Sequence, residues 1–231
     1  ERRLIGAYGE LKFDYKKMLF VDFTARNDWA STLPAGKNSF FYPAVSAAFV
    51  LTEAVKIDPK ALSYLKLRAG FAQAGSGGED PYLLTNVDVL SITEDGYANS
   101  EIHSPYPSGD GTVVAGYSVS DIKRNPQLKP EQTTSWEAGA DIGLWEDRIN
   151  IDFTYYQQHS KDLILTTAPI APSSGFTDRV INAGTARNNG FELGLNFVPV
   201  STTSGFKWEI FGTFTRNRNK VLNLPDGVDQ I

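Results

Sequence analysis

Alternation of apolar and polar residues is the feature that most constrains the fold of this sequence. In segment after segment every second residue is apolar, and the residues between are polar, charged or small. The pattern recurs over residues 5–13, 19–25, 45–51, 65–71, 136–144, 149–155, 191–197 and 208–214. Because a strand has a side-chain period of two and a helix a period near 3.6, the sequence predicts an all-β fold of about eight strands and argues against a helical or α/β fold.

The connections between these segments fall into two classes. Short or modest connections are Lys16 with Lys17, and residues 52–64, 145–148 and 200–206, of which 52–64 has room for one short helical turn. Between them lie longer connections, of which the longest is a loop over about residues 75–131. In an up-and-down antiparallel sheet every second connection lies at the same end. One end therefore carries turns and the other long loops, an asymmetry typical of outer-membrane barrels.

The two sets of alternating positions differ in chemistry. The polar set includes Lys66 and five further charged residues, Arg68, Glu137, Asp141, Asp152 and Glu192. A wide, watery lumen tolerates such charges, and the apolar set ends in aromatic residues such as Trp136, Tyr155 and Phe197, as at a membrane interface. Soluble β-sandwiches also alternate, so this pattern alone leaves a soluble, lectin-like binding module open as an alternative.

Composition excludes several classes of function. The 231 residues include no cysteine, which removes thiol nucleophiles, disulfides and the common zinc sites. The net charge of −5 gives no basic surface for nucleic acid. Both histidines, His103 and His159, fall in predicted loops, and no nucleophile motif is present. We expect neither an enzyme nor a cofactor or metal site.

Five motifs, in order along the chain, resemble the SusC/RagA branch of the TonB-dependent outer-membrane transporters. They are "ARNDWAS", "FFYPAVSAAFVLTE", "YLKLRAGFAQAG", "NPQLKPEQTTSWEAGADI" followed by "DRINIDFTYYQQHSKDLIL", and "VINAGTARNNGFELGLNF". The resemblance covers nearly the whole chain. It implies a transmembrane, antiparallel barrel of about 22 strands whose lumen is closed by a plug.

The same resemblance implies a function and partners. Such proteins import a bulky nutrient, an oligosaccharide or a peptide, across the outer membrane of a Gram-negative bacterium. The TonB-ExbB-ExbD system supplies the energy through the plug, and a SusD-like surface lipoprotein forms a lid. Residues 1–231 resemble a central-to-late part of one barrel domain, without the plug and the final strands. We expect this part to be stable only with the rest of its barrel, because lipid does not tolerate open sheet edges.

Two groups of residues are candidates for contact with other molecules. Aromatic and imidazole side chains on loops suit stacking on sugars or peptides, and these are Trp29, Tyr82, Tyr97, His103, Tyr106 and Tyr117. Packing of the same loops against their neighbours or the lid is an equally open role. The inward-facing charges Arg68, Glu137, Asp141, Asp152 and Glu192 are candidates for lining the substrate path or, more often, holding the plug.

Overall fold

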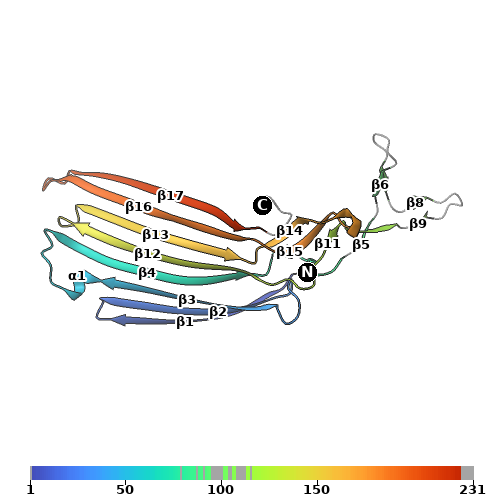
Figure 1. Ribbon diagram of the computed structural model, residues 1–231. Helices are drawn as coiled ribbons and strands as arrows, with labels where there is room; N and C mark the ends of the chain where they lie inside the picture. The colour runs from blue at the N-terminus through green and yellow to red at the C-terminus, as the bar shows by residue number, and fades with distance from the viewer. Residues whose placement is uncertain are drawn as a thin grey trace.

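A single antiparallel sheet of eight strands dominates the computed structural model (Figure 1). The structure describes residues 2–78, 80–86, 88–90, 92–94, 101–103, 106–107, 113–114 and 116–224. The strands follow the sheet order β1 (Leu4–Tyr15), β2 (Leu19–Ala30), β3 (Ser39–Val50), β4 (Leu62–Ser76), β12 (Glu131–Leu144), β13 (Ile149–Lys161), β16 (Thr185–Ser201) and β17 (Lys207–Asn223). Each of the eight alternating segments lies in one of these strands, apart from Leu51 directly after β3, so the all-β prediction is confirmed.

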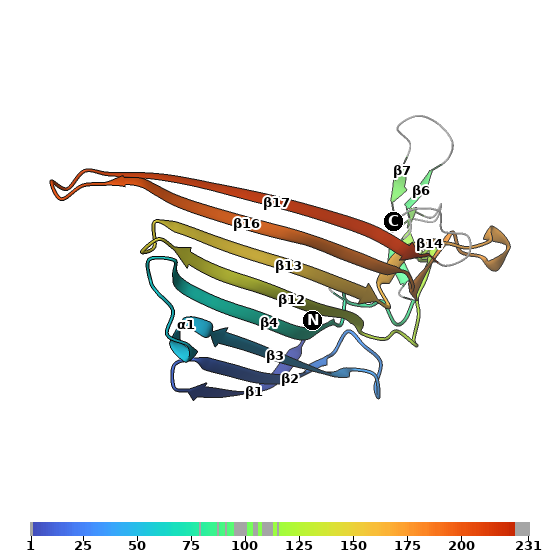
Figure 2. The same cartoon turned by 60° about the vertical axis from the view of Figure 1, so that its left-hand side comes forward.

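The strands lie side by side in one curved layer, with tight turns at one end and long connections at the other (Figures 1 and 2). The β1–β2 turn has Lys16 at φ 51° and Lys17 at φ 58°, and the Met18 amide donates to the Tyr15 carbonyl at 3.0 Å. Two successive positive φ values define the type I′ turn, whose twist matches that of the flanking strands. The expected helical turn is also present, as α1 (Leu51–Ala54) between β3 and β4.

A proline inside β3 determines how far that strand pairs. Pro43 is opposite Ala25 of β2, but the pairing of β3 with β4 runs only from Ala44 to Val50. Proline has no backbone N–H to donate to a second neighbour. Beyond Pro43, therefore, β3 pairs with β2 alone, and the ring of Phe40 covers Gly75 of β4, where a Cβ would lie 2.5 Å from the ring.

The long connections carry small elements at the loop end of the sheet. Residues 77–130 contain β5 (Asp88–Leu90), β6 (Ile92–Glu94), β7 (Glu101–His103), β8 (Tyr106–Pro107), β9 (Val113–Val114), β10 (Tyr117–Val119) and β11 (Ile122–Lys123). The connection from β13 to β16 contains β14 (Ile164–Pro169), the 3₁₀ turn η1 (Pro172–Ser174) and β15 (Asp178–Asn182), and β15 pairs with both β14 and β11.

The buried hydrophobic cluster lies at this loop end, and we call it the loop core. Its members are Ala30, Leu33, Phe40, Leu83, Leu128 and Val180. Leu128, in "NPQLKPE", is fully buried. Asn182, in "VINAG", holds the same segment, because its side chain accepts the Lys129 amide at 2.8 Å and donates to the Lys129 carbonyl at 2.8 Å. Two of the motifs noted in the sequence thus bind each other.

Candidate functional site

The register of the sheet divides its side chains between two unlike faces. Cross-strand partners share a face, and Phe71 is opposite Trp136, while Phe153 is opposite Leu193. Aromatic rings pack along this apolar face, with ring centroids 5.3 Å apart for Trp136 and Tyr155 and 5.7 Å apart for Phe191 and Phe214. The opposite side, the polar face, carries the five charged candidates of the sequence analysis, from Arg68 on β4 to Glu192 on β16.

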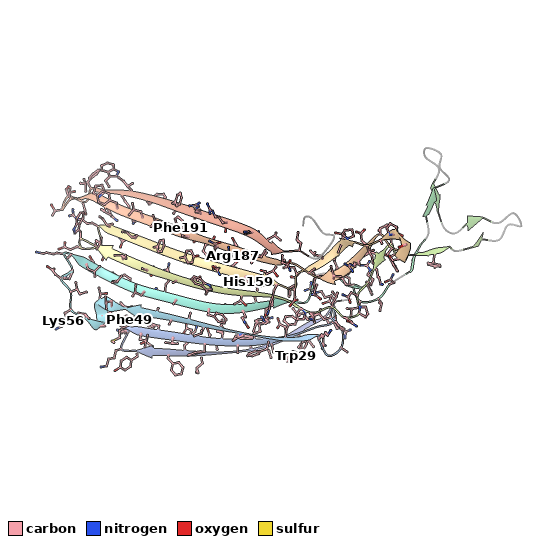
Figure 3. All side chains as sticks on the ribbon, in the orientation of Figure 1. Trp29, Phe49, Lys56, His159, Arg187 and Phe191 are labelled. Atoms are coloured by element: carbon pink, nitrogen blue, oxygen red, sulfur yellow. The ribbon has the colours of Figure 1, made fainter. Side chains whose placement is uncertain are left out.

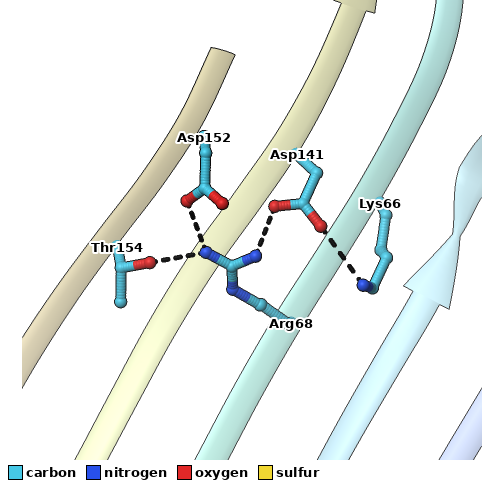
Figure 4. A network of polar contacts seen from close by, with 5 residues as sticks. All are labelled: Lys66, Arg68, Asp141, Asp152 and Thr154. Carbon is cyan, nitrogen blue, oxygen red and sulfur yellow. Dashed lines mark hydrogen bonds and ion pairs between the residues drawn. The ribbon is translucent and has the colours of Figure 1, made fainter. Parts of the chain in front are cut away.

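A charge network occupies the middle of the polar face (Figure 4). Asp141 on β12 and Asp152 on β13 are direct cross-strand partners, so two like charges face each other. The Arg68 guanidinium lies between them, with Nη1 paired to Asp141 and Nη2 donating to Asp152 Oδ1 at 2.6 Å and to the Thr154 hydroxyl at 2.6 Å. Lys66 Nζ lies 3.2 Å from the other Asp141 oxygen. The network holds two cations and two anions and is neutral in total.

Glycines make room for the large side chains of this face. Gly139 is opposite Arg68, and a Cβ there would lie 2.7 Å from Arg68 Nε. Glu137 is opposite Gly70 in the same way, where a Cβ would lie 3.2 Å from the Glu137 side chain. Neighbouring strands lie only about 4.8 Å apart. A charged side chain can therefore lie flat across the next strand only where that strand has a glycine.

Three carboxylates of the polar face, those of Asp22 on β2, Glu137 and Glu192, remain without a partner within the described part of the chain. None of the three side chains has a hydrogen bond or an ion pair there, and Glu137 and Glu192 are exposed. They line one hollow of about 540 Å³, together with Gly70, Thr154 and Tyr156. The hollow therefore presents unpaired negative charge beside hydroxyl groups, which suits a cationic or hydrogen-bonding group from another segment or molecule.

A second polar cluster lies nearer the loops and was not found from the sequence. The carboxylate of Asp28 is 4% exposed, accepts from Arg26 Nε at 2.8 Å and also accepts from the Tyr42 hydroxyl. Thr32, also buried, donates to the Gly77 carbonyl at 2.8 Å. The Asp28 bonds tie β2 to β3, and the Thr32 bond fastens the β2–β3 connection to the end of β4. The polar run "RND" continues β2 beyond its apolar segment.

Trp29 is not in a loop, so its predicted placement is wrong. It lies in β2, opposite Ile5 of β1 and Ser39 of β3, and is 40% exposed. Its odd position puts it on the same face as Val21 and Phe23, the apolar face. The strand extends past the apolar segment because both of its neighbours continue to pair with it. An aromatic side chain at this place belongs with the interfacial rings of the apolar face.

The other loop candidates are spread over the 77–130 connection. Tyr82 and Tyr117 are 60% and 64% exposed, and Tyr82 has a positive φ of 64°. His103 ends β7 and Tyr106 begins β8, each described by its backbone alone. Tyr97 lies outside the described residues. The exposed tyrosines retain the flat apolar ring and free hydroxyl on which their candidacy rests.

No group of three or more His, Asp or Glu side chains among the described residues is arranged to hold a metal ion. No helix among those residues has the length and apolar composition needed to cross a membrane.

Comparison with known proteins finds a family match for nearly the whole chain. The family model described as "TonB dependent receptor-like, beta-barrel" matches residues 1–230. The TonB-dependent receptor SusC of Bacteroides thetaiotaomicron is 29% identical over 232 residues, covering 98% of this chain and 21% of SusC. TonB-dependent receptor P3 of Formosa agariphila is 27% identical over 232 residues, covering 99% of this chain and 21% of the receptor. The chain spans about a fifth of the length of these relatives.

Solved structures agree on the fold. The RagAB peptide transporter superposes with a TM-score of 0.79 at 19% identity, covering 99% of this chain and 23% of the transporter chain. The siderophore receptor PirA from Pseudomonas aeruginosa superposes with a TM-score of 0.55 at 16% identity, covering 95% of this chain and 35% of the receptor. A β-sandwich packs two sheets face to face, and the single curved sheet with these neighbours excludes that alternative.

Proposed function

The chain belongs to the TonB dependent receptor-like β-barrel family, and from this premise we propose that the whole protein imports a bulky nutrient across the outer membrane of a Gram-negative bacterium. The nutrient class is an oligosaccharide or a peptide. This chain supplies part of the barrel wall and of the loops that meet ligand and lid. One observation carries the proposal, namely a sheet with a continuous apolar face for lipid and a charged, glycine-spaced face for a wet lumen.

The polar face divides its charges between two roles. Lys66 and Arg68 together neutralise Asp141 and Asp152 within the wall, so a plug is not needed to satisfy them. Glu137 and Glu192 are unpaired at the 540 Å³ hollow, and we assign these two as the contacts for cationic groups of the plug or of a passing ligand. Of the five residues that the sequence suggests as plug contacts, we therefore retain two, Glu137 and Glu192.

Capture of the nutrient is assigned to the loop end. The exposed rings of Tyr82 and Tyr117 offer faces for stacking on sugar rings or peptide side chains. In the import cycle proposed here, ligand binds between these loops and a surface lipoprotein lid. TonB then displaces the plug at the expense of the inner-membrane proton gradient, and the lumen becomes the passage. No covalent chemistry is assigned to any residue.

Uptake by the intact cell tests this function. A strain lacking the full-length gene and its complemented strain are incubated with a fluorescent pool of oligosaccharides and, separately, of peptides. We expect the deletion to abolish accumulation of one pool, and a protonophore to abolish it in the complemented strain. Equal accumulation of both pools with and without the gene, or recovery of the protein in the soluble fraction, would refute the proposal.

A variant test separates the two roles on the polar face. Glu137→Gln with Glu192→Gln should weaken plug docking and raise the passive permeability of the barrel to a bulky antibiotic. Asp152→Asn, which removes a carboxylate already paired with Arg68, is the matched control and should leave permeability unchanged. If the control alone raises permeability, the assignment of roles is wrong.

A further inference from the structure

The apolar face changes character abruptly near the loop end of β13, β16 and β17. Along β17 its residues are Trp208, Ile210, Gly212 and Phe214, followed at the next alternate positions by Arg216, Arg218 and Lys220. The register places Arg216 opposite Phe191, and Lys220 opposite Arg187 of β16. Arg187 is in turn opposite His159 of β13, and these two are labelled with Phe191 in Figure 3. Basic side chains thus continue the rows that aromatic rings occupy farther down.

We call this set the basic belt, and it consists of His159, Lys161, Arg187, Arg216, Arg218 and Lys220. No Asp or Glu occupies a position of the apolar face on these three strands, since Asp152, Glu192 and Glu209 all lie on the polar face. Within the part of the chain that the structure describes, no side chain of the belt has an ion pair or a hydrogen bond. In a chain of net charge −5, five arginines and lysines without an acid form a marked local excess.

The height of the belt above the turns fits the edge of a membrane. From Trp208 to Arg216 the strand advances about 26 Å at about 3.3 Å per residue. A tilt of about 40° reduces this to about 20 Å of height, close to the apolar band of about 25 Å that outer-membrane barrels present to lipid. The rings of Trp136, Tyr155 and Phe191 lie in the rows of Arg218 and Arg216, and the ring of Phe214 lies in the next row toward the turns, so the belt overlaps the place where an interfacial girdle is expected. Arg218 and Lys220 therefore lie at the level of lipid headgroups on the loop side.

We propose that the basic belt binds the phosphate groups of the anionic glycolipid in the outer leaflet, and so anchors this side of the barrel to its lipid. The inference rests on the proposed outer-membrane location. Arginine forms bidentate hydrogen bonds with phosphate oxygens, and Arg187 of β16 lies opposite Lys220 of β17, with Arg218 at the next position of the same face of β17. The basic charge of the belt complements an anionic partner. Its position favours lipid over an acidic polymer, because the belt borders the apolar face and not the lumen.

Binding of lipid A to the purified full-length protein tests the belt. The protein in a non-ionic detergent is titrated with bisphosphorylated lipid A, and bound lipid is counted by native mass spectrometry. The variant is Arg187→Gln with Arg218→Gln and Lys220→Gln, and the matched control is Lys56→Gln with Lys60→Gln, in the connection at the opposite end of the strands (Figure 3). We expect the belt variant to bind ten- to a hundredfold more weakly, and the control to bind as the wild type does.

Two further arms make the outcome specific. Lipid A stripped of its phosphates should bind the wild type as weakly as bisphosphorylated lipid A binds the belt variant. Unchanged affinity of the belt variant overturns the proposal. A belt variant that melts at a lower temperature but binds lipid A with unchanged affinity also overturns the proposal. In that case the belt forms ion pairs with carboxylates of an adjoining strand. Uptake is measured on the same strains, so that a protein that imports nutrient but ignores lipid A refutes this inference and leaves the proposed function intact.

Discussion

Replacing Arg68 by glutamine tests the physical account of the polar face most directly. The substitution leaves the carboxylates of Asp141 and Asp152 opposed on adjacent strands with no guanidinium between them. Two unit charges about 5 Å apart repel by about 3 kcal/mol at an effective dielectric of about 20, and by about 1 kcal/mol in water. Asp141 is 23% exposed and Asp152 60% exposed, so the site lies between these limits. We expect a loss of about 1 to 3 kcal/mol in the free energy of unfolding.

The measurement is urea unfolding of the full-length protein in detergent, because an uncharged denaturant does not screen the charges. Arg68→Gln combined with Asp152→Asn removes the repulsion and should recover most of the loss, because Lys66 still pairs with Asp141 at 3.2 Å. Lys12→Gln is the matched control, since it removes the cation of the exposed pair with Glu10. Such surface pairs contribute about 0 to 1 kcal/mol.

Salt gives an independent check on the cause. Added salt screens repulsion between partly exposed carboxylates, so the gap between Arg68→Gln and the wild type should narrow as the salt concentration rises. The reasoning is refuted if the single variant unfolds at the wild-type midpoint, or if the double variant is less stable than the single one. A gap that does not respond to salt would point to lost packing of the arginine side chain and not to charge.

Three further substitutions test other parts of the fold. Gly139→Ala should lower the free energy of unfolding by about 1 to 3 kcal/mol, because the new Cβ would lie 2.7 Å from a backbone carbonyl oxygen. Gly194→Ala is the control and should cost less, because its nearest neighbouring atom is 3.6 Å away. Equal unfolding midpoints for the two variants would contradict this. Asn182→Ala removes three hydrogen bonds to backbone, so limited proteolysis of the loop core should accelerate while the sheet keeps its unfolding midpoint. Lys16→Asn with Lys17→Gly suits the positive φ values of the turn and should add about 0.5 to 1 kcal/mol, and a lowered midpoint would count against the type I′ assignment.

The sheet could be predicted from the sequence because each face meets a different medium. A strand between lipid and water has to alternate strictly between apolar and polar residues. Phe153 and Asp152 can therefore be assigned to opposite faces from the sequence alone, before the neighbouring strands are known. The prediction was weakest where that contrast ends. Trp29 lies in β2 beyond the apolar segment, where "RND" alternates among polar residues only, and the end of the strand was therefore placed too early.

Partnerships between strands could not be predicted in the same way. Arg68 pairs with Asp141, 73 residues away, and with Asp152, 84 residues away, and only the register of the sheet brings the three together. The sequence does contain one signal for the loop core. Leu128 is the lone apolar residue between two prolines in "NPQLKP", and it proves to be a fully buried member of the loop core. A single large apolar side chain in a stiff polar segment is a candidate anchor, because a fixed backbone costs little entropy to dock.

The distribution of charge separates the two jobs of the barrel wall. On the polar face the central charges are paired within the wall, which leaves the described part of this face close to neutral apart from Asp22, Glu137 and Glu192. A passage lined by many unpaired charges would hold a charged ligand too strongly to release it, so internal neutralisation favours transit. On the other face the unpaired charges of the described strands are all basic and lie toward the loop end. In the import cycle proposed above, neutralised charge suits the surface past which a solute moves, and unpaired basic charge suits the surface that faces the lipid.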